Sequence, residues 1–146
     1  MNIVDANVLL YAVNTDAVHH EPSRRWLDSA LSGGATVGFS WIAMLAFVRL
    51  STKVGLFPSP LNVTDALARI EVWTAQPSAV MANPGATHLS LVTSLLAGVG
   101  TGGNLVNDAH LAALAIEHRG VVVSYDHDFA RFAGLTWRTP VAPPAG

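Results

Sequence analysis

Short runs of uncharged, mostly β-branched residues alternate along this chain with longer segments in which apolar residues recur every three or four positions. The first pattern predicts buried strands and the second predicts amphipathic helices. Strands are expected at residues 2–4, 36–39, 80–82, 121–124 and 136–138. Helices are expected at residues 22–31, 41–54, 63–75, 86–97 and 107–118.

This alternation predicts an α/β fold with a mostly parallel sheet of four or five strands and helices on both faces. Local signals agree with the helix bounds. Pro22 suits a first helical turn, Thr64 with Asp65 suits a helix start, and Gly120 suits a helix end. Because no linker divides the chain, we expect one domain over residues 1–139 and a loose proline-rich tail over 140–146.

The composition is poor in charge. Hydrophobic residues make up 51% of the chain and charged residues 12%, about half the usual charged share. So few charges leave apolar surface that a second copy or a different protein would cover. The segment 41–75 is apolar on more than one helical face, which a single buried face does not require. A monomeric enzyme with an apolar surface is the alternative.

Charge, cysteine content and hydropathy narrow the class of protein. The net charge of −2 gives no overall attraction to nucleic acid or acidic membranes, although a local basic patch is compatible with it. The absence of cysteine excludes disulfides, zinc–thiolate sites and thiol nucleophiles. The stretch "WIAMLAFV" is too short to span a bilayer, and the start lacks a basic signal-peptide region. We expect a soluble, cytoplasmic protein without membrane contact.

Four of the ten acidic residues stand at unusual places. Asp5 follows the first strand inside an apolar run, where an ionised carboxylate is costly unless it is hydrogen-bonded, paired or bound to a cation. Asp108 opens an apolar helix, and Asp126 and Asp128 follow the most hydrophobic strand. Because ligand sites of such sheets lie beyond the carboxyl ends of the strands, we expect these carboxylates to converge there.

Converging carboxylates repel one another unless a hard divalent cation lies among them. Oxygen ligands favour Mg²⁺ or Mn²⁺ over zinc, and such ions commonly bind phosphates and activate water. Structural roles remain open: Asp108 suits a helix dipole, while Asp126 and Asp128 suit a turn or a cap. The other acidic residues are expected to be solvated or to start helices: Asp16, Glu21, Asp28, Asp65, Glu71 and Glu117.

Three segments together resemble a known family. They are "NIVDANVLLYAV", "NLVNDAHLAALAIEHRGVVVSYDHDFARF" and the closing "GLTWRTP". In order and spacing they are similar to PIN domains, in particular to the VapC-type toxins of bacterial toxin–antitoxin pairs. The resemblance spans nearly the whole chain. It implies a three-layer α/β/α domain that acts as a Mg²⁺- or Mn²⁺-dependent endoribonuclease, usually as a homodimer, and is held inactive by a cognate antitoxin.

The resemblance also implies roles for individual residues. Asp5, Asp108 and Asp126 match the metal-binding aspartates. Asp128 matches the second acid of the last motif and would help to hold the attacking water, which makes all four aspartates candidate catalytic residues. Asn7 matches a polar residue of the same cleft. The substrate would be structured RNA with a single-stranded loop.

One position departs from the family pattern. PIN domains usually carry a glutamate early in the second long helix, and Ala46 stands there, with Arg49 three residues later. The missing carboxylate points to weaker metal binding or a single-metal site. It also keeps a second hypothesis open, in which the chain is a catalytically inactive PIN-like module that only binds RNA or protein.

Several further residues suit a nuclease, although ordinary structural roles explain each of them. The candidate phosphate contacts are Arg24, Arg25, Arg49, Lys53, Arg131 and Arg138. His110 and His127 are near the acidic motifs, but we expect surface or structural roles for both. The four tryptophans, Trp26, Trp41, Trp73 and Trp137, are expected to pack in the core or at an interface rather than to stack on bases.

Two other families also place a carboxylate after the first strand. Phosphatases with an aspartate nucleophile need a second aspartate two residues later, and this chain has Asn7 there. Response-regulator receivers need a late lysine, whereas the single lysine here is Lys53. Both families fit the residues less well than a PIN domain does.

Overall fold

The computed structural model describes residues 1–141, and its five strands form one sheet in which every neighbouring pair is parallel. The strand order is β3-β2-β1-β4-β5. The strands are β1 Asn2–Val4, β2 Val37–Phe39, β3 Ala79–Met81, β4 Val121–Val123 and β5 Trp137–Arg138. All five predicted strands are present. Residues 142–146 of the predicted tail lie outside the described residues.

Helices connect the strands, as a parallel sheet requires. They are α1 Ala6–Val13, α2 His20–Ser32, α3 Trp41–Ser51, α4 Val63–Thr74, α5 His88–Val99, α6 Leu105–Glu117 and the short 3₁₀ helix η1 His127–Arg131. The helix α1 was not predicted, because its uncharged residues directly continue the apolar run of β1. Asp5 separates the two elements: its backbone is extended, and its side chain caps α1.

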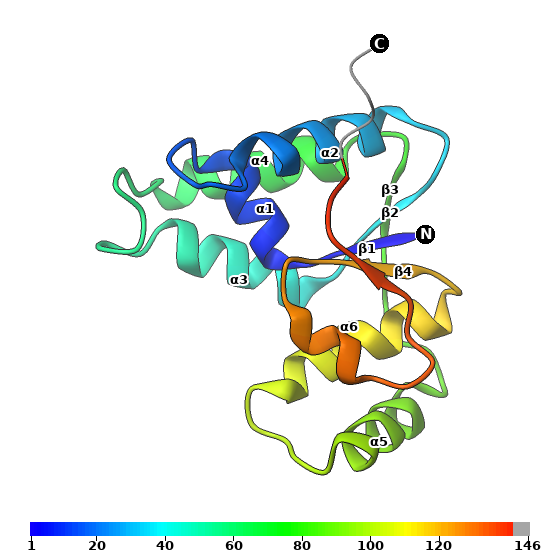
Figure 1. Cartoon of the computed structure of the whole chain (residues 1–146). Coiled ribbons are helices and arrows are strands. Elements are labelled where there is room, and N and C mark those ends of the chain that lie inside the picture. Colours follow the sequence, from blue (N-terminus) through cyan, green and yellow to red (C-terminus); the bar gives the residue numbers. More distant parts are fainter. Residues whose placement is uncertain (142–146) are drawn as a thin grey trace.

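The helices form two layers around the sheet (Figure 1): α1 to α4 lie on one side, and α5 and α6 lie on the other. Successive residues of β1 face opposite layers, since Ile3 packs with Leu111 and Leu114 of α6 while Val4 packs with Leu9 and Phe47 on the other side. The predicted α/β/α domain with helices on both faces is therefore confirmed.

The helix start predicted at Thr64 and Asp65 is present, because α4 begins at Val63 with Asp65 in its first turn, and Asn62 caps it by accepting a hydrogen bond from the Asp65 amide. The helix end predicted at Gly120 was assigned to the wrong residue, since α6 is capped at His118. At the end of α6, Arg119 adopts the left-handed conformation (φ 52°). Gly120 is needed for a different reason, because a Cβ atom there would collide with the Met1 carbonyl group. Side chains that compete for the same cap cannot be ranked from local sequence alone.

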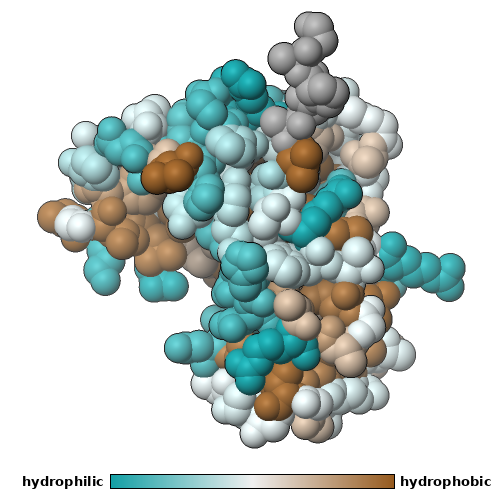
Figure 2. Space-filling view, in the orientation of Figure 1, coloured by the Kyte–Doolittle hydropathy of each residue, from teal (hydrophilic) through white to brown (hydrophobic). Residues whose placement is uncertain are grey.

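Hydrophobic side chains remain exposed on α3, α4 and their connection, as the composition indicated. Figure 2 shows hydrophobic residues at the left edge of the molecule, where the α3–α4 connection lies in Figure 1. The exposed hydrophobic residues of this surface are Trp41, Leu45, Val54, Leu56, Val63, Leu67 and Val72. Among the described residues, no helix has the length and apolar character needed to cross a membrane.

Candidate metal centre

Asp5 lies where β1 meets α1, with its carboxylate already hydrogen-bonded by the protein. Its Oδ1 accepts from the Ala6 amide at 2.7 Å, and its Oδ2 accepts from the Ser124 hydroxyl at 2.7 Å and the Asn7 amide at 3.3 Å. Burial raises the pKa of Asp5, the hydrogen bonds from Ser124 and Ala6 lower it, and the charge of Asp126 raises it. Burial has the largest effect, so the net shift is upward.

Ser124 joins the first and fourth strands at this edge. This fully buried residue follows β4, and besides donating to Asp5 it accepts from Nδ2 of Asn7 at 3.0 Å and from the Asp126 amide at 3.0 Å. Asn7 closes the network, because its Oδ1 accepts from the Tyr125 amide at 3.2 Å. The arrangement fixes the position of Asp5 relative to the segment that carries Asp126.

The remaining three acids form a close cluster. Each of Asp108, Asp126 and Asp128 offers a carboxylate oxygen, and these oxygens all lie within 4.8 Å of one another. Asp108 is in the first turn of α6. Asp126 precedes η1 and accepts a hydrogen bond from the Asp128 amide at 2.9 Å, while Asp128 is exposed. The structure thus brings together α6 and the end of β4.

The surroundings of Asp108 shift its pKa. The pKa is raised from 3.8 to about 7, most of all by partial burial and further by the negative charges of Asp126, Asp5 and Asp128. Within the described residues, no hydrogen-bond donor or positive side chain offsets this repulsion at Asp108. Asp5 is thus close enough to influence the cluster, although it stands outside the group whose oxygens lie within 4.8 Å.

The donor set suits a hard divalent cation. All available ligand atoms are carboxylate oxygens, the kind that Mg²⁺ and Mn²⁺ prefer, and no sulfur or imidazole nitrogen belongs to the cluster. Positive charge at this point would also remove the repulsion that raises the pKa of Asp108. The α3 segment near Ala46 contains no acidic residue and adds no carboxylate.

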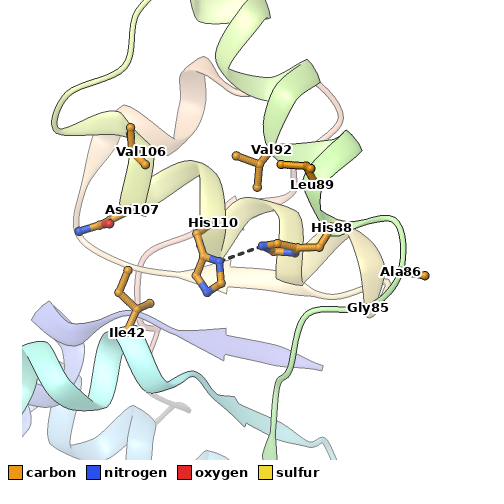
Figure 3. Close-up of a pocket in the computed structure, with 9 residues that line it drawn as sticks. All are labelled: Ile42, Gly85, Ala86, His88, Leu89, Val92, Val106, Asn107 and His110. Atoms are coloured by element: carbon orange, nitrogen blue, oxygen red, sulfur yellow. Dashed lines mark hydrogen bonds between the residues drawn. The ribbon is translucent and has the colours of Figure 1, made fainter.

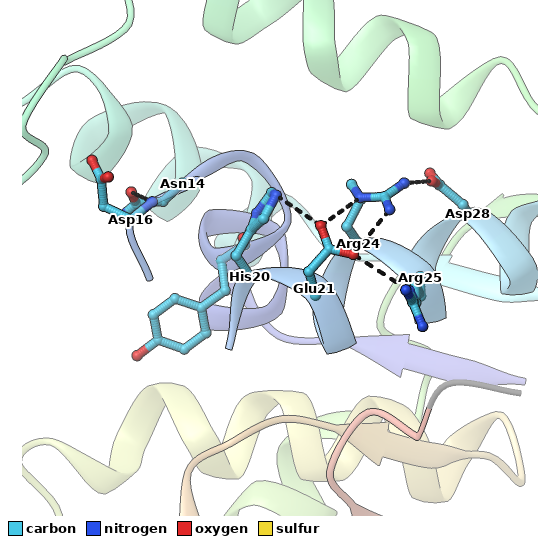
Figure 4. A network of polar contacts seen from close by, with 8 residues as sticks. Asn14, Asp16, His20, Glu21, Arg24, Arg25 and Asp28 are labelled. Carbon is cyan, nitrogen blue, oxygen red and sulfur yellow. Dashed lines mark hydrogen bonds and ion pairs between the residues drawn. The ribbon is translucent and has the colours of Figure 1, made fainter. Parts of the chain in front are cut away.

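Two of the candidate phosphate contacts belong to an ion-pair network on α2 (Figure 4). Arg24 lies 3.0 Å from Glu21 and 3.3 Å from Asp28, and Arg25 lies 3.3 Å from Glu21. Their charges are locally balanced. Arg138 donates to the side chain of Asn2 at 2.7 Å, and Arg49, Lys53 and Arg131 are exposed.

The tryptophans divide between core and surface. Trp26 and Trp73 are buried, which confirms the expectation of core packing. Trp137 is half-buried and donates from its indole nitrogen to the Ser124 carbonyl oxygen at 3.0 Å. Trp41 is 62% exposed.

Sequence reasoning missed Ser124 and misjudged Glu117. Ser124 carried one usable signal, since it is a polar residue directly between a buried strand and an aspartate. Glu117 was expected on the surface, and this was wrong: its side chain is 9% exposed and bonds to His88, 29 residues earlier. No local pattern connects two residues so far apart.

Comparison with known proteins identifies the family. A family model for the PIN domain matches residues 3–135. Ribonuclease VapC37 of Mycobacterium tuberculosis is 61% identical over 142 residues, which cover 97% of this chain and 99% of that protein. The chain belongs to the PIN-domain family. Ribonuclease VapC33 of the same organism is also similar, at 36% identity over 97% of this chain and 99% of the relative.

Solved structures confirm the PIN fold. VapC20 of M. tuberculosis, a sarcin–ricin loop cleaving toxin, matches with a TM-score of 0.71 and 16% identity over 98% of this chain and 100% of that one. VapBC2 from Rickettsia felis, bound to a DNA fragment from its promoter, matches with a TM-score of 0.66 and 17% identity over 94% and 97% of the two chains.

Proposed function

We propose that this PIN-domain protein is a metal-dependent endoribonuclease toxin of the VapC type that hydrolyses RNA phosphodiester bonds. The observation that carries the proposal is the gathering of Asp5, Asp108, Asp126 and Asp128 at one edge of a PIN sheet. The relatives support it, because VapC37 and VapC33 are named ribonucleases and VapC20 cleaves the sarcin–ricin loop.

Asp5, Asp108 and Asp126 are the proposed metal ligands, and Asp128, which belongs to the cluster of close carboxylate oxygens, would bind the ion directly or through water. A Mg²⁺ or Mn²⁺ ion there would stabilise charge on the phosphate and lower the pKa of a bound water. Of the lone pairs on the Asp5 carboxylate, those not used by Ser124, Asn7 and Ala6 remain available.

The chain itself supplies position and order. Ser124 and Asn7 orient Asp5, and the Asp128 amide orients Asp126, so these carboxylates present fixed oxygens to the phosphate-binding edge. The exposed Asp128 would hold the attacking water. Attack by water needs no 2′-hydroxyl nucleophile. Preference for RNA would therefore come from its shape and its single-stranded loops.

A cognate antitoxin and a second copy of the chain are the proposed protein partners. The exposed hydrophobic surface of α3, α4 and their connection supports a protein partner, since seven large hydrophobic side chains are exposed there. VapBC2, a similar structure, is a complex of this class.

The decisive experiment is incubation of purified, antitoxin-free protein with total RNA in Mg²⁺ or Mn²⁺, with cut sites mapped by sequencing. Discrete cuts are expected with wild-type protein and with Asp65→Asn. The latter removes an acidic residue from the first turn of α4, away from the cluster. No cuts are expected with Asp5→Asn, with Asp108→Asn or with EDTA.

The result also decides the meaning of Ala46. Metal-dependent cuts would show that a PIN nuclease works with alanine at this position. Folded protein that makes no cuts in either metal would contradict the proposal and leave the binding module as the function.

A further inference from the structure

A cavity of about 570 Å³ opens between α3, α5 and α6. Most of its wall is apolar and comes from Ile42, Leu89, Val92 and Val106 (Figure 3). Its volume lies within the usual range of small-molecule pockets, in which a few polar groups on an apolar wall set specificity. The polar side chains here are Asn107, His88 and His110.

The two histidines belong to a chain of hydrogen bonds that ends in the cavity. Oε1 of Glu117 lies 2.5 Å from Nδ1 of His88, and Nε2 of His88 lies 2.8 Å from Nδ1 of His110. The second oxygen of Glu117 accepts from the Gly85 amide at 2.7 Å. The side chains of His88 and Glu117 are only 14% and 9% exposed. Such a chain holds both rings in fixed orientations.

With Glu117 ionised and His88 neutral, the carboxylate sets the direction of every hydrogen bond in this chain. An ionised Glu117 only accepts, so Nδ1 of His88 donates to it and Nε2 of a neutral His88 accepts. Nδ1 of His110 must then donate, which leaves Nε2 of His110 as an acceptor. Within the described residues this nitrogen has no hydrogen-bond partner, and Figure 3 shows it on the side of the ring away from His88. Nε2 of His110 is therefore a hydrogen-bond acceptor that the cavity holds in a fixed position.

The cavity and the proposed catalytic cluster share the start of α6. Val106 and Asn107 line the cavity, and Asp108 is the next residue along the helix. Residues two positions apart on a helix project from different faces, so an RNA strand with a phosphate at Asp108 would cross the first turn of α6 to place a neighbouring nucleotide beside Val106, Asn107 and His110. A ribose or a phosphate group does not suit the apolar wall, whereas the flat face of a base does.

We propose that this cavity binds an unpaired nucleobase next to the cleaved bond, with Nε2 of His110 accepting a hydrogen bond from an N–H group on the edge of the base. The inference rests on the proposed nuclease function and adds the element that selects the cut site. Asn107 also lines the cavity. Glu117 and His88 are positioning residues, because they orient the His110 ring. Unpaired bases held on side chains and read along their edges are a common form of RNA recognition.

Binding can be tested without cleavage. Wild-type protein in EDTA is titrated with each of the four nucleoside 5′-monophosphates and with ribose 5-phosphate, while NMR follows the imidazole signals of His110 and His88 and the amide of Asn107. At least one nucleotide is expected to give saturable shifts at these residues, and ribose 5-phosphate is expected to give none. Equal shifts with ribose 5-phosphate, or no shifts with any nucleotide, would overturn the proposal.

The hydrogen bond is tested with the best-binding nucleotide and its analogue methylated at the edge N–H. Methylation is expected to weaken binding about three- to tenfold in wild-type protein. The ratio should fall to about one in His110→Phe, which keeps a ring but lacks the acceptor. His118→Phe is the matched control, because it changes a histidine at the end of the same helix outside the cavity, and it should keep the wild-type ratio. A ratio unchanged in His110→Phe that folds would contradict the assignment.

A cleavage experiment distinguishes failure of the base-binding cavity from failure of the proposed nuclease function. An RNA with one mapped cut is remade with an abasic nucleotide on either side of the cut. Wild-type protein should lose at least about tenfold in kcat/KM at one of the two positions, and His110→Phe should lose much less. Normal cleavage of both abasic RNAs would support the nuclease function and contradict the base-binding cavity. Nucleotide binding without any RNA cleavage would support the base-binding cavity and contradict the nuclease function.

Discussion

Two carboxylates of the same edge, Asp5 and Asp108, are treated in opposite ways by the protein. Asp5 receives hydrogen bonds from a backbone amide, a hydroxyl and a side-chain amide. Asp108 receives no such compensation and is faced by the negative charges of Asp126, Asp5 and Asp128. The fold therefore compensates the burial of the first carboxylate in part, since its pKa is still raised, and leaves the second to whatever binds at the cluster. A residue that destabilises its own fold in this way is typical of a functional site.

The largest effect is expected when each of the two carboxylates is neutralised in turn. Asp5→Asn and Asp108→Asn should each lower RNA cleavage by about a hundredfold or more, because each removes a proposed metal ligand. Their effects on stability should have opposite signs. Without metal, Asp5→Asn should destabilise the protein by about 1–2 kcal/mol, since the new amide nitrogen cannot accept the hydrogen bonds that Oδ2 receives from Ser124 and Asn7, while Asp108→Asn should stabilise it. Urea unfolding in EDTA measures both.

The matched control for these variants is Asp65→Asn, which neutralises an acidic residue in the first turn of α4. It should lower stability slightly, because the helix dipole favours a negative charge there. If Asp108→Asn destabilised the metal-free protein as Asp65→Asn does, Asp108 would be an ordinary helix-start residue, and the difference between the two carboxylates would disappear.

The network that compensates Asp5 can be broken at Ser124. Ser124→Ala removes the donor to Asp5 and the acceptor for Asn7 and the Asp126 amide, all inside a buried site. Groups left without partners in such a place cost about 1–3 kcal/mol in unfolding free energy, and cleavage should fall as Asp5 loses its orientation. Ser51→Ala is the control, because Ser51 is equally buried but makes one long hydrogen bond of 3.5 Å within its own helix. Equal losses in the two variants would show that Ser124 only fills space.

The pH dependence of stability tests Asp108 without changing its neighbours. Its pKa is about 7 in the folded protein, against 3.8 for the free side chain in the unfolded protein, so the folded state binds more protons between these values. Stability of the metal-free protein should therefore fall as pH rises from about 4 to about 7 and then level off. Because Asp108 is partly exposed, solvent screening limits the loss to about 1–2 kcal/mol. Thermal unfolding in EDTA should show it.

Two changes should flatten this profile between pH 4 and 7. Asp108→Asn removes the titrating group, and saturating Mn²⁺ holds the carboxylate in its ionised form. A profile that kept its slope in Asp108→Asn would assign the protons to other groups, with Asp5 the first to examine because its pKa is also raised.

The sequence predicted features that depend on local pattern and missed those that depend on distant partners. Periodicity located the strands and most helices, and an acidic residue after each of two buried strands predicted the edge at which the carboxylates meet. Hydrogen bonds between residues far apart in the sequence could not be predicted in this way. The donor to Asp5 is a serine 119 positions away, and the acceptor for His88 is a glutamate 29 positions away. The helix α1 escaped for a different reason, because its uncharged residues have no polar face that would distinguish them from a strand.

The smallest expected effect concerns Arg24, whose charge is compensated as fully as that of Asp5 but on the open surface. Arg24→Ala should leave stability almost unchanged, since exposed ion pairs contribute little. Its effect on RNA binding should also be small, because Glu21 and Asp28 already balance the charge that would meet a phosphate.

The slope of log Kd against log salt concentration for an RNA oligonucleotide should stay at the wild-type value. In contrast, the loss of an arginine that contacts a phosphate lowers this slope by about one, and Arg49 and Arg131, both exposed, are the variants to compare. A reduced slope in Arg24→Ala would mean that RNA displaces the acidic partners, so that a charge balanced in the free protein becomes available in the complex.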